Sequence, residues 1–419
     1  MMAVSRQSAA EPRSLLSQAA RRLRPSATGS MSQHARELKA QGRDIIALSA
    51  GEPDFDTPPH VLEAASEAMS KGHTRYTTVS GIPELREAIR KKFLRENGLE
   101  FAVDQILVST GGKQVIANAM LATIDPGDEV VIPAPYWVSY PELVSFCGGS
   151  PVLLPSDAKS DFVVSPAQLE GAITAKTKWL ILNSPCNPSG AVYAEADLVA
   201  LADVLRRNPH VHVLADDIYE HLIYSGLPFR TLAAVAPDLS GRILTMNGVS
   251  KAYAMTGWRI GYAGGPKYLI KAMEKIQGQT TSCPNSVAQW AAVAALEGPQ
   301  DFLAVRRQSF AKRRDHVVAE LNAAPGIFCG TPDGAFYAYP SCVGTFGKRT
   351  PGGVHIVNDE SFCRALLDET GVAVVYGSAF GIPGHFRVSY AASIEQLAEA
   401  CRRIRAFCDA LKPAVGEGA

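Results

Sequence analysis

The chain has 419 residues, 47% of them hydrophobic, which is enough for a large buried core and roughly two or three domains. Lys plus Arg and Asp plus Glu both number 41, so no charge surplus points to nucleic acid or a membrane surface. No apolar run approaches the roughly 20 residues that a membrane span requires. The eight cysteines form no CxxC pair and the nine histidines lack ligand spacing, so we expect reduced thiols, a cytoplasmic protein and no metal site.

Residues 1–23 are rich in Ala, Ser and Arg and hold a single acid, Glu11. We expect a flexible N-terminal extension, and the composition also allows a transit peptide. Beyond it, residues 34–41 are predicted as a helix capped by Ser30 or Ser32. A strand over 44–49 then runs into a loop at 50–55 whose glycine and proline leave backbone N–H groups exposed. Helices are predicted next over 58–69 and 83–96.

From residue 104 the pattern alternates between short apolar runs, turns and helical stretches. Strands are predicted at 106–109, 130–133, 179–183, 211–216, 243–246 and 259–263. This alternation predicts an α/β fold with a largely parallel sheet covered on both faces. A helix over 300–323 leads into a smaller α+β segment with strands at 335–339, 372–375 and 386–390. We therefore predict a large domain over 58–310 and a small domain formed by 24–57 and 311–419.

Chemically useful residues gather where the predicted strands end. In such sheets ligands bind beyond the carboxyl ends of the strands. Lys251 follows one strand directly after an Asn-Gly turn signal, where desolvation would lower the pKa of its amine. That position by itself also fits a lysine reaching solvent. The residues that converge on this edge are Gly112, Trp137, Asn187, Asp216, Tyr219 and Lys251.

Together these groups suit a phosphorylated aromatic aldehyde. A phosphate would sit on the glycine turn at Gly112, where a helix begins, with Ser250 and Arg259 adding bonds. An aromatic ring would stack on Trp137. Asp216 would keep a ring nitrogen protonated, and Tyr219 would donate to a phenolate oxygen. With Lys251 as the Schiff-base former, these are the needs of pyridoxal 5′-phosphate.

The sequence resembles the fold-type-I, class I/II pyridoxal-phosphate aminotransferases, closest to bacterial Ib-type aspartate aminotransferases, some of which act on prephenate. The resemblance runs from about Arg24 to beyond residue 400. The matching motifs are SAGEPDFDTP (49–58), GIPELRE (81–87), GGKQ (111–114), PYWVSYP (135–141), NSPCNPSG (183–190), DDIYE (216–220), SKAYAMTGWRIGY (250–262) and FRVSY (386–390). The departures at Cys186, at Asp217 and in 376–380 remove no chemical role.

The resemblance implies a role for each matched residue. Lys251 would bond the cofactor and carry the proton between substrate and cofactor, Asp216 would pair with the ring nitrogen, and Tyr219 and Asn187 would contact the ring oxygen. Arg387 would bind the substrate α-carboxylate, assisted by the Gly51 backbone and Asn187. The phosphate would be surrounded by Gly112, Lys113, Ser250 and Arg259. A homodimer is implied, because Tyr76 resembles the tyrosine that reaches the partner's phosphate.

Substrate choice rests on fewer residues. Lys113 resembles the lysine that holds the second carboxylate of dicarboxylic substrates, and Arg24 could add another cation. Both favour aspartate and 2-oxoglutarate, with prephenate as a further acceptor. An aminotransferase for aromatic, alanine or basic amino acids stays open, as does a pyridoxal-phosphate lyase. A regulator with a helix-turn-helix is not expected, since only about 40 residues precede Asp44.

Overall fold

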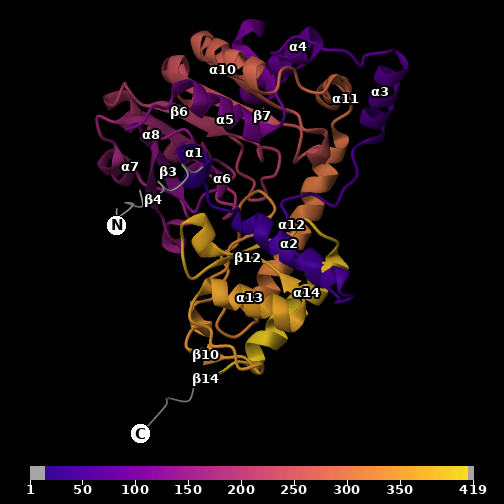
Figure 1. Ribbon diagram of the computed structural model, residues 1–419, viewed down its shortest axis with the longest axis vertical. Helices are drawn as coiled ribbons and strands as arrows, with labels where there is room; N and C mark the ends of the chain where they lie inside the picture. Colours follow the sequence, from indigo (N-terminus) through magenta and orange to yellow (C-terminus); the bar gives the residue numbers. More distant parts are fainter. Residues whose placement is uncertain (1–14, 414–419) are drawn as a thin grey trace, which may run out of the picture.

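The structure, a computed structural model, describes residues 15–413. Its elements form two lobes, one built around a large sheet and the other carrying α13 and α14, with helix α12 running between them (Figure 1). No helix within 15–413 is both long and apolar enough to cross a bilayer.

The first lobe is organised around a seven-stranded mixed sheet. Its strands are β2 (Ile106–Ser109), β3 (Glu129–Ala134), β4 (Ser150–Pro155), β5 (Thr177–Asn183), β6 (His212–Asp216), β7 (Ile243–Gly248) and β8 (Gly261–Gly264). Their order is β2-β8-β7-β6-β5-β3-β4, and only β8 runs antiparallel to its neighbours. This confirms the predicted α/β fold. The strand missing from the prediction is β4, an edge strand with a proline near each end, where a missing N–H donor is tolerated.

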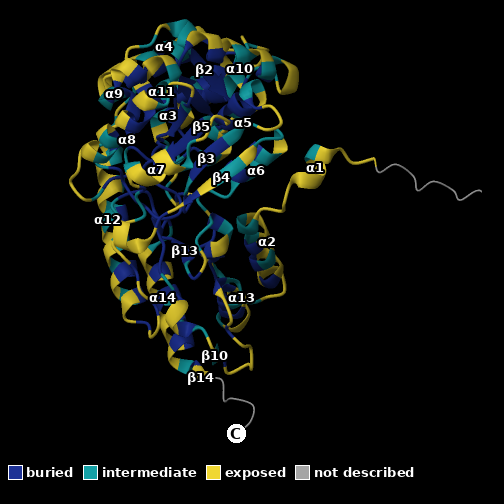
Figure 2. Cartoon of the chain, turned by 90° about the vertical axis from the view of Figure 1, so that its left-hand side faces the viewer, coloured by how far each residue is buried: buried dark blue, intermediate teal, exposed yellow. Residues whose placement is uncertain are grey.

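Helices cover both faces of this sheet, because alternate strand residues point to opposite sides. Ile106 and Val108 of β2 belong to one buried cluster, whereas Leu107 between them belongs to another. Figure 2 shows inner strands of the sheet buried beneath partly exposed helices, whereas the edge strand β4 is partly exposed. The helices of this lobe are α3 (Pro59–Ser70), α4 (Pro83–Lys92), α5 (Gly112–Thr123), α6 (Ser139–Phe146), α7 (Pro166–Ala172), α8 (Glu195–Arg207), α9 (Leu232–Val235), α10 (Lys267–Thr280) and α11 (Ser286–Glu297).

The second lobe has its own core and three small sheets. Its strands are β1 (Ile46–Ala47), β9 (Tyr337–Ala338), β10 (Lys348–Arg349), β11 (Val372–Ala373), β12 (Val375–Tyr376), β13 (Phe386–Ser389) and β14 (Lys412–Pro413). Its helices are α2 (Ala27–Ala40), α12 (Asp301–Asn322), α13 (Asp359–Thr370) and α14 (Ile394–Ala410). Parallel pairing of β1 with β11 joins an N-terminal segment to the C-terminal part of the chain. The domain limits given above remain a prediction.

Several local predictions were wrong for identifiable reasons. Helix α2 begins earlier than predicted, because the Ser26 hydroxyl accepts a hydrogen bond from the Gly29 N–H at 3.3 Å. The Asn247-Gly248 pair is no turn but the end of β7, because buried Asn247 donates to Glu220 at 2.8 Å.

In the predicted N-terminal extension, α1 (Gln18–Arg22) is helical. Residues 1–14 lie outside the described residues, so the expectation of flexibility or a transit peptide there is not addressed.

Candidate active site

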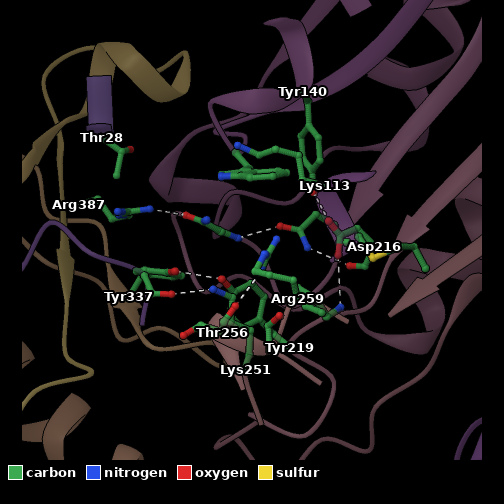
Figure 3. A pocket seen from close by; sticks show the side chains of 18 residues that line it. Thr28, Lys113, Tyr140, Asp216, Tyr219, Lys251, Thr256, Arg259, Tyr337 and Arg387 are labelled. Carbon is green, nitrogen blue, oxygen red and sulfur yellow. Dashed lines mark hydrogen bonds between the residues drawn. The ribbon is translucent and has the colours of Figure 1, made fainter. Parts of the chain in front are cut away.

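A cavity of about 250 Å³ opens at the carboxyl ends of β5, β6 and β7 and is also lined by residues of the second lobe. Of the thirteen residues predicted from sequence, eleven line it: Gly51, Gly112, Lys113, Trp137, Asn187, Asp216, Tyr219, Ser250, Lys251, Arg259 and Arg387. Figure 3 shows side chains from both lobes turned toward this space. The fold thus gathers residues spread over more than 300 positions.

Lys251 lies just beyond β7, partly buried, and its Nζ donates to the Gly51 carbonyl oxygen at 2.6 Å. Removal from water lowers the pKa of Lys251 to about 8, and the positive charges of Arg387 and Arg259 act in the same direction. An amine with such a pKa is unprotonated in a useful fraction near neutral pH. It can therefore act as a nucleophile or as a proton carrier.

Asp216 ends β6 and is buried at the floor of the cavity. Its Oδ2 accepts a hydrogen bond from the Tyr140 hydroxyl at 2.5 Å, and its Oδ1 accepts one from the Ile218 N–H at 3.3 Å. Burial raises the pKa of Asp216 to about 6, whereas the bond from Tyr140 opposes that rise. A buried carboxylate held in this way is suited to pairing with a protonated nitrogen.

Glycines and cations form one end of the cavity. A Cβ on Gly111 would come 2.2 Å from Nη2 of Arg259, and one on Gly261 would come 2.3 Å from the Gly112 nitrogen. The helix start at Gly112 therefore exposes backbone N–H groups beside the Arg259 guanidinium, which is an arrangement suited to an anion. Lys113 lies close by, with Nζ 5.0 Å from the centre of the Trp137 ring. Burial and the charge of Arg259 lower the pKa of Lys113.

Arg387 faces the cavity from β13 and is 2% exposed. Its Nη1 donates to Asn187 Oδ1 at 2.9 Å and its Nη2 donates to the Ser49 carbonyl oxygen at 2.5 Å. Its Nε is buried without a hydrogen-bond partner among the described residues. A buried guanidinium with donor capacity left over is suited to a carboxylate.

Two predicted residues lie outside this cavity. Tyr76 is 92% exposed. The Arg24 side chain is 80% exposed and forms an ion pair with Glu142 at 3.1 Å. Arg24 lines a neighbouring groove between the two lobes instead.

Sequence reasoning did not select seven further residues that line the cavity: Thr28, Tyr140, Asn183, Ile218, Met246, Thr256 and Tyr337. Tyr140 lies three residues after Trp137, in the first turn of α6, and its N–H donates to the Trp137 carbonyl oxygen at 3.0 Å. Thr28 and Tyr337 come from segments with no signal of their own, because only the packing of the second lobe brings them to the strand ends.

The chain matches the family described as aminotransferase class I and II over residues 43–404. It belongs to that family, whose members depend on pyridoxal phosphate. It is 59% identical to a probable aspartate/prephenate aminotransferase of Rhizobium leguminosarum, covering 95% of this chain and 99% of the relative. It is 56% identical to an aspartate/prephenate aminotransferase of Cereibacter sphaeroides, with 94% and 99% covered.

Solved structures agree with these relatives. The aspartate aminotransferase of Rhizobium meliloti superposes with a TM-score of 0.92 at 54% identity, covering 95% of this chain and 99% of that one. The aspartate aminotransferase of Thermus thermophilus with maleate superposes with a TM-score of 0.87 at 44% identity, with 94% and 99% covered. The fold predicted from the motif resemblance is thereby confirmed.

Proposed function

We propose that this protein transfers an amino group from L-aspartate to 2-oxoglutarate, giving oxaloacetate and L-glutamate, with prephenate as a further amino acceptor. The observation that carries the proposal is the convergence of Lys251, Asp216 and Arg387 on one cavity. A nucleophilic amine, a buried carboxylate and a carboxylate-binding fork are the three groups that this chemistry needs. The names of the relatives supply the substrate class.

The residues present fit pyridoxal phosphate. The Gly112 N–H, Ser250 and Arg259 would hold its phosphate, where glycine keeps the backbone within reach of an anion. Asp216 would hold a proton on the ring nitrogen, Tyr219 and Asn187 would bond the ring oxygen, and Trp137 would stack on the ring. When bound, the cofactor supplies a carbonyl that takes up the amino group and a ring that delocalises negative charge.

The protein's own groups then bind the substrate and move the proton. Arg387 would hold the α-carboxylate in two parallel hydrogen bonds, assisted by Asn187 and the Gly51 backbone. This fixes the bond from Cα to hydrogen near Lys251, whose amine would take the proton from Cα and deliver it to the cofactor's C4′ carbon. The lowered pKa of Lys251 keeps that amine partly unprotonated at neutral pH.

Specificity for a second carboxylate would come from Lys113, with Arg24 as an additional cation. Lys113 lies in the cavity beside Trp137, whereas Arg24 would have to leave Glu142 to reach it.

We further propose a homodimer, in which the exposed Tyr76 reaches the phosphate site of the partner subunit. If the protein is monomeric in solution at the concentration used for the activity assay, the proposed homodimer is contradicted.

A matrix of amino donors and 2-oxo acids, assayed with the purified protein loaded with pyridoxal phosphate, tests the proposal. Aspartate with 2-oxoglutarate should be the fastest pair, and Lys251→Ala should abolish turnover. A faster rate with aromatic, alanine or basic donors would select the alternative aminotransferase. Product formed without any 2-oxo acid would indicate a lyase.

A further inference from the structure

Tyr337 of β9 occupies a position that the proposed chemistry has not yet used. Its side chain is 1% exposed and lines the cavity from the second lobe (Figure 3). The fit around its hydroxyl is tight, since a Cβ on Gly51 would come within 2.2 Å of that oxygen. A large buried polar side chain packed this closely has a fixed orientation, so it can orient the residues that it contacts.

The hydroxyl of Tyr337 contacts one residue of the proposed machinery. Its oxygen lies 2.9 Å from the hydroxyl oxygen of Tyr219, and either can donate. Once Tyr219 donates its single proton to a ligand, its oxygen is free to accept the proton of Tyr337. Donation from Tyr337 would then strengthen donation by Tyr219, because hydrogen bonds in a chain polarise one another.

The ring of Tyr337 contacts a different residue. The guanidinium carbon of Arg387 lies 4.6 Å from the centre of this ring, and 5.0 Å from that of Phe380. Nη1 of Arg387 is hydrogen-bonded to Asn187 and Nη2 to Ser49. The contacts with the two rings then fix the orientation of the guanidinium plane. A cation–π contact out of water contributes to that placement.

We propose that Tyr337 is a positioning residue with two separable roles: its hydroxyl orients Tyr219 toward the cofactor's ring oxygen, and its ring orients Arg387 toward the substrate carboxylate. The inference rests on the function proposed above. The charged groups around the pair come from two other elements: Arg387 on β13 and Asp216 at the end of β6. Neither of them can replace the Tyr337 hydroxyl as a neutral donor to Tyr219.

Two variants separate the roles in protein loaded with pyridoxal phosphate. Tyr337→Phe keeps the ring and removes the hydroxyl, whereas Tyr337→Leu removes both. One readout is the midpoint of the pH-dependent visible absorption of the bound cofactor. The other is the Kd of maleate, an unreactive dicarboxylate, from absorbance titration. Tyr339→Phe is the matched control, because it loses a buried hydroxyl that donates to the Gly377 carbonyl oxygen at 3.0 Å, outside the cavity.

For Tyr337→Phe we expect the absorption midpoint to rise by about half a pH unit, with the Kd of maleate changed less than about threefold. The sign follows because the deprotonated state places one more negative charge beside Tyr219, so weaker donation disfavours that state. For Tyr337→Leu we expect the same rise and about tenfold weaker maleate binding. The control should keep both wild-type values.

A wild-type midpoint in Tyr337→Phe, or wild-type maleate affinity in Tyr337→Leu, would overturn the inference. So would a Tyr337→Phe variant in which the absorption midpoint rises and the Kd of maleate also changes by more than about threefold. If Tyr337→Leu does not fold, Tyr337→Met tests the ring, and the Phe variant decides the hydroxyl by itself. Wild-type protein that binds pyridoxal phosphate without visible, pH-dependent absorption would refute the proposed function itself. Failure of the proposed function is thereby distinguished from failure of the inference about Tyr337, which shows only in the variants.

Discussion

The Tyr140 hydroxyl donates to Asp216 Oδ2 at 2.5 Å, and both side chains are buried. Burial and the neighbouring Asp216 charge raise the pKa of Tyr140, so the phenol stays protonated and remains a donor. The bond thus favours the ionised form of Asp216 against the burial that raises its pKa to about 6. If Asp216 pairs with the cofactor's ring nitrogen as proposed, Tyr140 would set the pH range in which that carboxylate stays ionised.

Tyr140→Phe should weaken the affinity for pyridoxal phosphate at acidic pH. Without the donor, the pKa of Asp216 rises further above about 6, so the carboxylate becomes neutral at a higher pH. Measuring the Kd of the cofactor from pH 5 to 8 should show affinity falling earlier on acidification in the variant. The cofactor's own titration is common to both proteins and cancels in the comparison.

Tyr193→Phe is the control for that experiment, because its buried hydroxyl accepts a bond from the Val164 N–H at 3.3 Å away from the cavity. Identical pH profiles for wild type and Tyr140→Phe would show that the donor does not control Asp216.

Arg387→Lys should lower kcat/KM for every amino acid substrate by roughly 100-fold, the effect of about two charge-assisted hydrogen bonds. A lysine keeps the charge but loses the planar fork. Steady-state kinetics with aspartate and alanine check this. Arg402→Lys, which changes an exposed pair with Glu399 at 2.7 Å, should leave the kinetics unchanged. A loss confined to aspartate would place the α-carboxylate elsewhere.

Lys113→Ala should reduce the preference for aspartate over alanine by roughly tenfold, because only aspartate has a second carboxylate to lose a partner. The ratio of the two kcat/KM values is the measurement, and it cancels any general loss of cofactor affinity. Lys271→Ala, which breaks an exposed pair with Glu274, serves as the control. An unchanged ratio in Lys113→Ala would refute the proposed specificity.

Lys92→Met should lower the free energy of unfolding by about 3–5 kcal/mol, since it leaves Glu220 charged and buried without the lysine that neutralises it. The neighbouring Lys91 pairs with Glu297 at the surface, with a side chain 52% exposed, so Lys91→Met should change stability little. Urea unfolding of the two variants in the same buffer compares them. Equal losses would contradict a special contribution from the buried pair.

The sequence by itself determined most of the sheet and its ligand-binding edge. Strand β2 was predicted at its observed bounds, because a short, wholly buried strand is marked by a continuous apolar run ended by a glycine turn. The positions of Asp216 and Lys251 followed from the same rule, since parallel strands present their carboxyl ends together. These features depend on residues close to one another in the chain.

Tertiary structure alone decided the features that depend on distant partners. Asn247-Gly248 has the local pattern of a turn, but a hydrogen bond to Glu220 keeps it in β7. Tyr337 carried no signal of a site, and Tyr140 stood in a matched motif without an assigned role, because their roles arise from contacts with Tyr219 and Asp216 made only when the chain is folded. Local pattern therefore locates the chemistry along the chain, and packing between elements determines which groups orient it.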